Sequence, residues 1–155
     1  MKIVFALVYL LTLTGCGMSE DDDTLSQNRA TARVEKLVRD TAAALTPRPQ
    51  LELIPVSVTP TACLDKSESL QKIVVSRAYW LRGVGKAQHM VVSRQVADYW
   101  KDLGFQVIAK SAKPDNPELS GVTEPDKFIV ALTWASGDHI YLAATSPCVW
   151  PEAHR

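Results

Sequence analysis

The chain has no excess of charge of either sign, because its 155 residues include 17 Lys and Arg and 17 Asp and Glu. A nucleic-acid-binding domain normally carries a basic excess, so this balance argues against nucleic acid as a partner. It argues equally against an acidic, self-repelling disordered chain. The apolar run at residues 3–13 is 11 residues long, whereas about 20 are needed to cross a bilayer. The length and the hydrophobic fraction of 46% therefore indicate one ordinary globular domain.

The short apolar run follows Lys2 and precedes small residues, which is typical of a secretory signal rather than a membrane span. Leu13-Thr14-Gly15-Cys16 resembles the lipobox of bacterial lipoproteins. The resemblance implies that residues 1–15 are a cleaved signal peptide and that Cys16 becomes a lipidated N-terminus. It places the protein on the outer face of the bacterial cytoplasmic membrane, since two acyl chains anchor a protein stably. The alternatives are an ordinary cleaved signal with a coincidental cysteine and a buried cysteine in a core helix.

An acidic stretch, Glu20–Asp23, follows the expected lipidation site. Removing residues 1–15 would delete one cation and no acid, so the mature net charge is 16 − 17 = −1. Four consecutive carboxylates beside anionic headgroups are repelled, which predicts that residues 16–25 form a solvated tether. A calcium site is the weaker alternative reading of so many carboxylates.

Two cysteines, Cys63 and Cys148, are left if Cys16 is lipidated. A disulfide persists outside the reducing cytosol, so we expect these two to pair. The bond would close a long loop and stabilise the fold by roughly 4 kcal/mol. Two buried thiols and a metal pair are the alternatives. Neither cysteine lies in a CxxC motif or has a histidine at ligand spacing.

Hydrophobic periodicity predicts two amphipathic helices, at residues 26–45 and 86–103, with Val92, Val96, Tyr99, Trp100 and Leu103 as the apolar stripe of the second. Between them, four prolines predict an extended connector over residues 47–60 and disfavour a central strand. Alternating or β-rich segments predict strands at 72–82, 105–109, 128–134 and 140–144.

Residues 111–126 are polar and contain three prolines, so we expect a long loop there. The order of elements predicts an α+β fold, with an antiparallel sheet of about four strands, two helices packed on one face and one disulfide. A single domain over residues 26–151 would bury about two-thirds of its surface and need no cofactor. Residues 152–155 are expected to form a tail.

No catalytic or metal-binding constellation is evident. Gly83-Val84-Gly85-Lys86 follows a strand and opens a helix, but it lacks the outer glycine and the Ser or Thr of a phosphate-binding loop. We interpret it as a tight turn. His89 and Ser93 stand four apart on one helix with Asp98 on another face, which is not a nucleophilic triad. His139 lies at a hairpin turn and His154 in the expected tail.

Aromatic residues offer the one candidate interaction surface. Strand alternation must turn either Tyr79 or Trp80 away from the helices, and Arg77 or Arg82 would flank the exposed ring. Arg77, Tyr79 and Arg82 are therefore candidate residues of a face that binds a partner strand or ligand. The competing interpretation is a partly exposed aromatic residue covered by the long loop.

Residues 60–151 are similar to a group of small actinobacterial lipoproteins. The features that carry the similarity are Cys63, the Tyr79-Trp80 strand, the helix end 96–105 and the closing segment 145–151. The resemblance implies an envelope location and a second half-cystine at Cys148, but it transfers no activity. We expect a non-catalytic lipoprotein, anchored to the membrane through Cys16, that presents its domain to an envelope protein or a small ligand. The alternative is an enzyme acting on the cell wall or a lipid with groups gathered from distant loops.

Overall fold

The computed structural model describes residues 25–64, 71–111 and 117–152. Its main sheet has six strands in the order β1-β4-β8-β7-β6-β5, and every neighbouring pair is antiparallel. The strands are β1 (Gln50–Leu53), β4 (Ser76–Arg82), β5 (Gln106–Ser111), β6 (Pro117–Val122), β7 (Ile129–Ala135) and β8 (His139–Thr145). A separate two-stranded ribbon pairs β2 (Thr61–Ala62) with β3 (Ile73–Val74).

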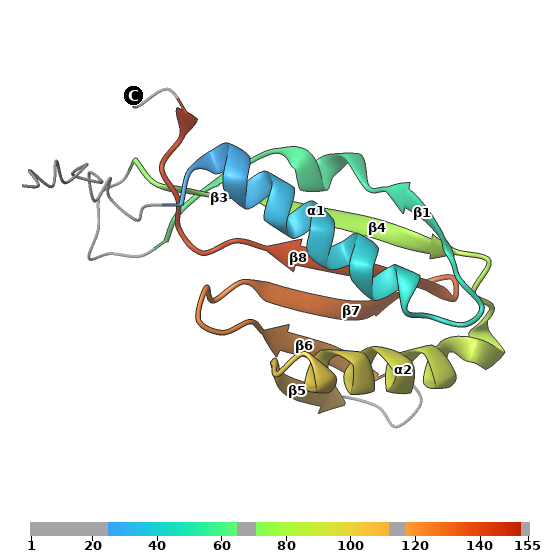
Figure 1. Cartoon of the computed structure of the whole chain (residues 1–155). Helices are drawn as coiled ribbons and strands as arrows, with labels where there is room; N and C mark the ends of the chain where they lie inside the picture. Colours follow the sequence, from blue (N-terminus) through green and yellow to red (C-terminus); the bar gives the residue numbers. More distant parts are fainter. Residues whose placement is uncertain (1–24, 65–70, 112–116, 153–155) are drawn as a thin grey trace, which may run out of the picture.

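Both α-helices lie on one face of the sheet (Figure 1). α1 (Gln27–Ala43) packs on β4 and β8, and α2 (His89–Asp102) packs on β5 and β6. Two short 3₁₀ helices, η1 (Pro55–Val58) and η2 (Lys86–Gln88), follow β1 and precede α2. The prediction of an α+β fold with two helices and an antiparallel sheet is confirmed.

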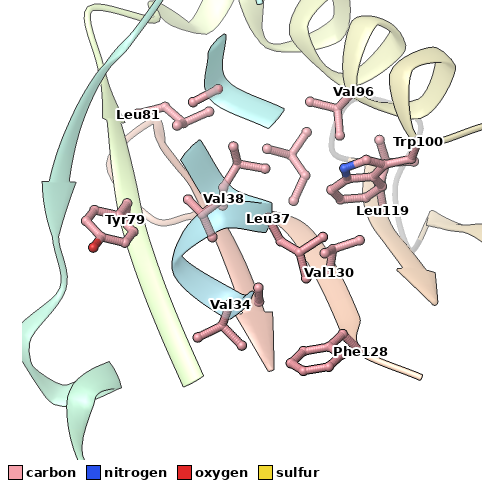
Figure 2. Close-up of a cluster of buried hydrophobic side chains, with 14 of the residues drawn as sticks. Val34, Leu37, Val38, Tyr79, Leu81, Val96, Trp100, Leu119, Phe128 and Val130 are labelled. Carbon is pink, nitrogen blue, oxygen red and sulfur yellow. The ribbon is translucent and has the colours of Figure 1, made fainter. Parts of the chain in front are cut away.

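The core lies between the helices and the sheet. Val34, Leu37 and Val38 of α1 project onto the strands, next to Val130 of β7 (Figure 2). Their spacing of three and four residues turns one stripe of the helix inward, as the periodicity predicts. The alternate residues of β7 and β8 that share this face are almost fully buried.

Trp100 joins the two helices and the sheet. Its indole nitrogen donates a hydrogen bond to the Thr41 hydroxyl of α1 at 3.0 Å, and the whole side chain is buried. The ring lies against Gly121, where a Cβ atom would come within 3.3 Å of it and within 3.0 Å of Val130 Cγ2. A glycine at this position of β6 is therefore needed for the close approach of α2. The predicted stripe of α2 is wrong at Leu103, which is 50% exposed.

Two sequence-based expectations about strands are corrected. The sheet has six strands rather than about four, and one of the added strands lies inside the expected loop 111–126. Residues 117–122 form β6 because they pair with β5 on one side and β7 on the other. The other added strand, β1, lies in the proline-rich connector, but its four residues lie between Pro49 and Pro55 and include no proline, so every residue of this edge strand keeps its amide.

The expected signal peptide, the lipidation site Cys16 and almost all of the tether lie outside the described residues, as does His154 of the expected tail. Within the part of the chain that the structure describes, neither helix is long and apolar enough to span a membrane.

Candidate functional site

The segment after β8 runs back beside the start of α1 (Figure 1). Trp150 accepts a backbone hydrogen bond from Gln27 at 3.2 Å, while Val149 and Ile73 exchange two backbone hydrogen bonds of 2.8 and 2.9 Å. The predicted disulfide is confirmed: it joins Cys148 to Cys63, with Cα atoms 5.8 Å apart. The C-terminal segment is therefore held between α1 and the β2–β3 ribbon.

A cavity of 580 Å³ opens where these segments meet. We call it the basic pocket, and its lining residues are Leu25, Arg29, Arg33, Lys72, Asp126, Phe128, Pro147, Cys148, Val149 and Trp150. Its volume is within the range of small-ligand sites, about 300–1,000 Å³. The lining combines apolar side chains with three cations and one carboxylate.

The charged groups of the basic pocket include one ion pair and two cations that lie near aromatic rings. Arg33 Nε contacts Asp126 Oδ2 at 3.1 Å, and the Thr123 hydroxyl donates a hydrogen bond to the other carboxylate oxygen. Arg33 also lies 6.0 Å from the centre of the Phe128 ring, and Lys72 Nζ lies 5.3 Å from that of Trp150. The three cations and one carboxylate sum to 3 − 1 = +2.

Arg29 is the exposed cation at the rim of the basic pocket. Among the residues that the structure describes, its guanidinium has no ion pair and no side-chain hydrogen bond. Arg29 and Arg33 are four residues apart on α1, so their side chains lie on the same face of the helix. An anion with an apolar portion would find both complementary charge and apolar contacts here.

The three residues predicted to form one binding face lie on two opposite faces of β4. Arg77 and Tyr79 project toward α1, where Arg77 Nε and the Tyr79 hydroxyl donate to Glu35 at 3.0 and 2.6 Å. Burial raises the pKa of Tyr79 above its usual value, and the hydrogen bond to Glu35 raises it further. These two residues hold a helix on the sheet and do not offer a free face.

Arg82, the third of those residues, lies on the opposite face of β4 with Trp80. Its guanidinium donates to both carboxylate oxygens of Glu52, at 2.8 and 2.9 Å, and lies 5.6 Å from the Trp80 ring centre. This hydrogen-bonded pair lowers the pKa of Glu52. Arg82 is thus already engaged on the side of the sheet away from the helices.

The remaining candidate residues lie apart from the basic pocket. His89 is 1% exposed at the start of α2, in edge-to-face contact with Trp134, and burial lowers its pKa below the usual value. His139 is exposed at the start of β8 and lies near Trp80. Over residues 25–64, 71–111 and 117–152, no group of three or more His, Cys, Asp or Glu side chains is placed to hold a metal ion.

Sequence reasoning did not single out the basic pocket. The sequence places Arg29 and Arg33 on the polar side of the first helix, but charged residues there are usually solvated and do not indicate a binding site. Nothing in the sequence indicates that Asp126 and Trp150 lie beside them, because these residues are separated by most of the chain. The one available signal was the four-residue spacing of Arg29 and Arg33.

Comparison with known proteins does not indicate what the basic pocket binds. No protein-family model, no curated protein and no solved structure matches the chain.

Proposed function

We propose that this protein is a non-catalytic, lipid-anchored binding module of the bacterial cell envelope, and that its basic pocket holds an anionic ligand with an apolar portion. The observation that carries the proposal is a cavity whose lining combines three cationic side chains with the apolar side chains of Phe128, Val149 and Trp150. Such a site orients a ligand through a few charged groups and gains affinity from apolar contact.

The anchor rests on the lipobox-like residues that end at Cys16, and its position relative to the pocket supports the proposal. Leu25 lines the basic pocket and is separated from Cys16 by 25 − 16 = 9 residues. Nine extended residues span at most about 30 Å. An anchored protein would therefore keep the pocket close to the membrane surface, where anionic amphiphiles are abundant.

The anchor is tested by the mass of the mature N-terminal peptide. We expect it to begin at Cys16 and to carry a diacylglyceryl group, with an added acyl chain where the N-terminus is modified. A peptide that contains unmodified Cys16 would contradict the anchor and leave the pocket proposal to be judged alone.

The pocket is tested with hexyl phosphate, which carries an anionic group on a short apolar chain. The protein is purified from membranes, reconstituted in phosphatidylcholine nanodiscs and melted while its tryptophan fluorescence is followed. A ligand that binds only the folded state raises the melting temperature, by an amount equivalent to about 2.7 kcal/mol at 100 times Kd. We expect stabilisation by hexyl phosphate and none by hexanol, its uncharged counterpart.

Two arginine variants make the test specific. Arg29→Ala removes a cation from the basic pocket and should weaken hexyl phosphate binding by about tenfold, the effect of losing one charge-assisted contact. Arg94→Ala removes the same charge from an exposed position on α2 and should leave the affinity unchanged. An equal loss of hexyl phosphate affinity in both variants would contradict the proposed ligand class. So would the absence of any stabilisation of the wild-type protein by hexyl phosphate.

A further inference from the structure

The loop between β6 and β7, residues 123–128, fixes the Asp126 carboxylate at the basic pocket. The buried Thr123 hydroxyl donates to one carboxylate oxygen of Asp126 and accepts a hydrogen bond from the backbone N–H of Phe128 at 2.9 Å. The backbone N–H of Thr123 donates to the Phe128 carbonyl at 2.9 Å, and that of Lys127 donates to the Thr123 carbonyl at 3.0 Å. The loop therefore holds the carboxylate through its own hydrogen bonds, whether or not an arginine pairs with it.

Arg33 meets this carboxylate through one nitrogen of its guanidinium. Nε donates to Asp126 Oδ2 at 3.1 Å, and the guanidinium carbon lies 6.0 Å from the centre of the Phe128 ring. Within the part of the chain that the structure describes, the two terminal nitrogens, Nη1 and Nη2, donate no hydrogen bond. The Arg33 side chain lines the basic pocket and is 38% exposed. Its orientation is thus fixed at Nε, while the edge formed by Nη1 and Nη2 remains to bind a ligand.

We infer that the Nη1–Nη2 edge of Arg33 binds two oxygens of the ligand's anionic group, and that Asp126 is the positioning residue that orients this edge. The inference rests on the proposed function, because it narrows the ligand of that same pocket to amphiphiles with a phosphate or carboxylate group. Two parallel N–H groups of a guanidinium match two oxygens of such a group, whereas an ammonium offers only a point charge. A guanidinium that is already oriented also loses less freedom when the ligand binds.

The first test compares two substitutions that keep the charge of the pocket. It measures the Kd of hexyl phosphate for the full mature protein in phosphatidylcholine nanodiscs. Arg33→Lys replaces the two-nitrogen edge with a single ammonium group and should weaken binding by at least about tenfold. Arg29→Lys makes the same change at the exposed rim, where the described residues place no carboxylate on the guanidinium, and should cause a much smaller loss. Similar changes of Kd in both variants would overturn the inference.

The second test separates the position of Asp126 from its charge. Asp126→Asn and Asp126→Ala remove the same negative charge, so electrostatics alone predicts the same Kd for both variants. The asparagine keeps an oxygen that accepts the Arg33 Nε–H, whereas the alanine keeps none. We expect Asp126→Ala to bind hexyl phosphate about fivefold more weakly than Asp126→Asn, the effect of one lost hydrogen bond. Equal affinities would overturn the positioning role, and the two lysine variants decide the inference if Asp126→Ala does not fold.

The outcomes separate the inference from the proposed function. Failure of the wild-type protein to bind hexyl phosphate would overturn the proposed function itself. Binding by the wild-type protein that Arg33→Lys retains in full would overturn the inference and leave the proposed ligand class intact. Discs that contain phosphatidic acid distinguish the sources of the anionic group. A higher apparent Kd in these discs, in the wild-type protein more than in Arg33→Lys, would support a lipid headgroup at Arg33, and an unchanged Kd would support a soluble ligand there.

Discussion

At the scale of single residues, the most unusual member of the core is a buried histidine. His89 is 1% exposed and packs its ring against Trp134, with 4.6 Å between ring centres. One turn later on α2, Ser93 is buried as well. The charged form of His89 loses its hydration in this environment, so burial lowers its pKa. A backbone hydrogen bond with Val84 and the charge of Asp138 act in the opposite direction, while Lys86 adds to the lowering.

The lowered pKa of His89 predicts acid sensitivity. The unfolded chain takes up this proton near pH 6.5, whereas the folded protein resists it, so the free energy of unfolding falls as the pH drops below about 6.5. The loss is about 1.4 kcal/mol for each unit by which the pKa is lowered. Urea unfolding between pH 7.5 and 5 measures it. His89→Phe, which cannot be protonated, should show a smaller decline, and an equal decline in both proteins would contradict the prediction.

At the scale of elements, Glu35 shows how α1 is fixed on the sheet. Its carboxylate accepts hydrogen bonds from Arg77 and Tyr79 of β4, and Arg39 Nη2 of the same helix approaches it at 3.4 Å. The Arg77 side chain is only 16% exposed. By contrast, Glu52 and Arg82 pair on the other face of the sheet with side chains that are 58% and 38% exposed. The two ion pairs therefore differ in burial and in geometry, because Arg82 donates to both oxygens of Glu52 whereas Arg77 and Tyr79 share those of Glu35.

This difference predicts unequal effects of one substitution. Glu35→Gln keeps the side-chain shape but leaves the largely buried Arg77 without its counter-charge, which should cost about 2 kcal/mol of unfolding free energy. Glu52→Gln weakens an exposed pair and should cost less than about 1 kcal/mol. Urea unfolding of the two variants at pH 7 provides the comparison, and similar losses would show that burial does not decide the contribution.

At the scale of the whole molecule, the disulfide joins the C-terminal segment to the residue that follows β2. It connects residues 85 apart, and two residues after Cys148 the backbone of Trp150 bridges to Ser26, just before α1. Glu152 adds to this contact, because its carboxylate accepts a hydrogen bond from the backbone N–H of Asn28 at 3.0 Å. The basic pocket is lined by residues from both sides of this junction, Cys148 included.

Removing the disulfide should therefore affect stability and binding together. Cys63→Ser/Cys148→Ser restores the freedom of a long loop in the unfolded chain and should lower the free energy of unfolding by roughly 4 kcal/mol. It also frees the segment that carries Val149 and Trp150, so hexyl phosphate affinity should fall while the variant is still folded. Denaturant unfolding and the nanodisc binding assay measure the two effects. Unchanged affinity would show that the C-terminal segment keeps its place without the bond.

Some elements of the fold follow from local pattern. α1, α2 and the β7–β8 hairpin lie close to their predicted positions, because an apolar stripe or strict alternation specifies both the conformation and the buried face. β6 could not be recognised in this way. Its residues Glu118, Ser120 and Gly121 have low strand preference, and the strand exists because its backbone pairs on both sides with β5 and β7.

The sequence by itself determined the α+β class and the two helices, since these depend on periodicity, and it predicted the pairing of Cys63 with Cys148 that the structure confirms. It also carries the lipobox-like motif, which stays a prediction. Only the tertiary structure decided that Arg77 and Tyr79 serve the helix interface and that Arg29, Arg33 and Lys72 surround one cavity. The physical reason is distance along the chain: periodicity acts over a few residues, whereas the basic pocket is assembled from segments near residues 29, 72, 126 and 150.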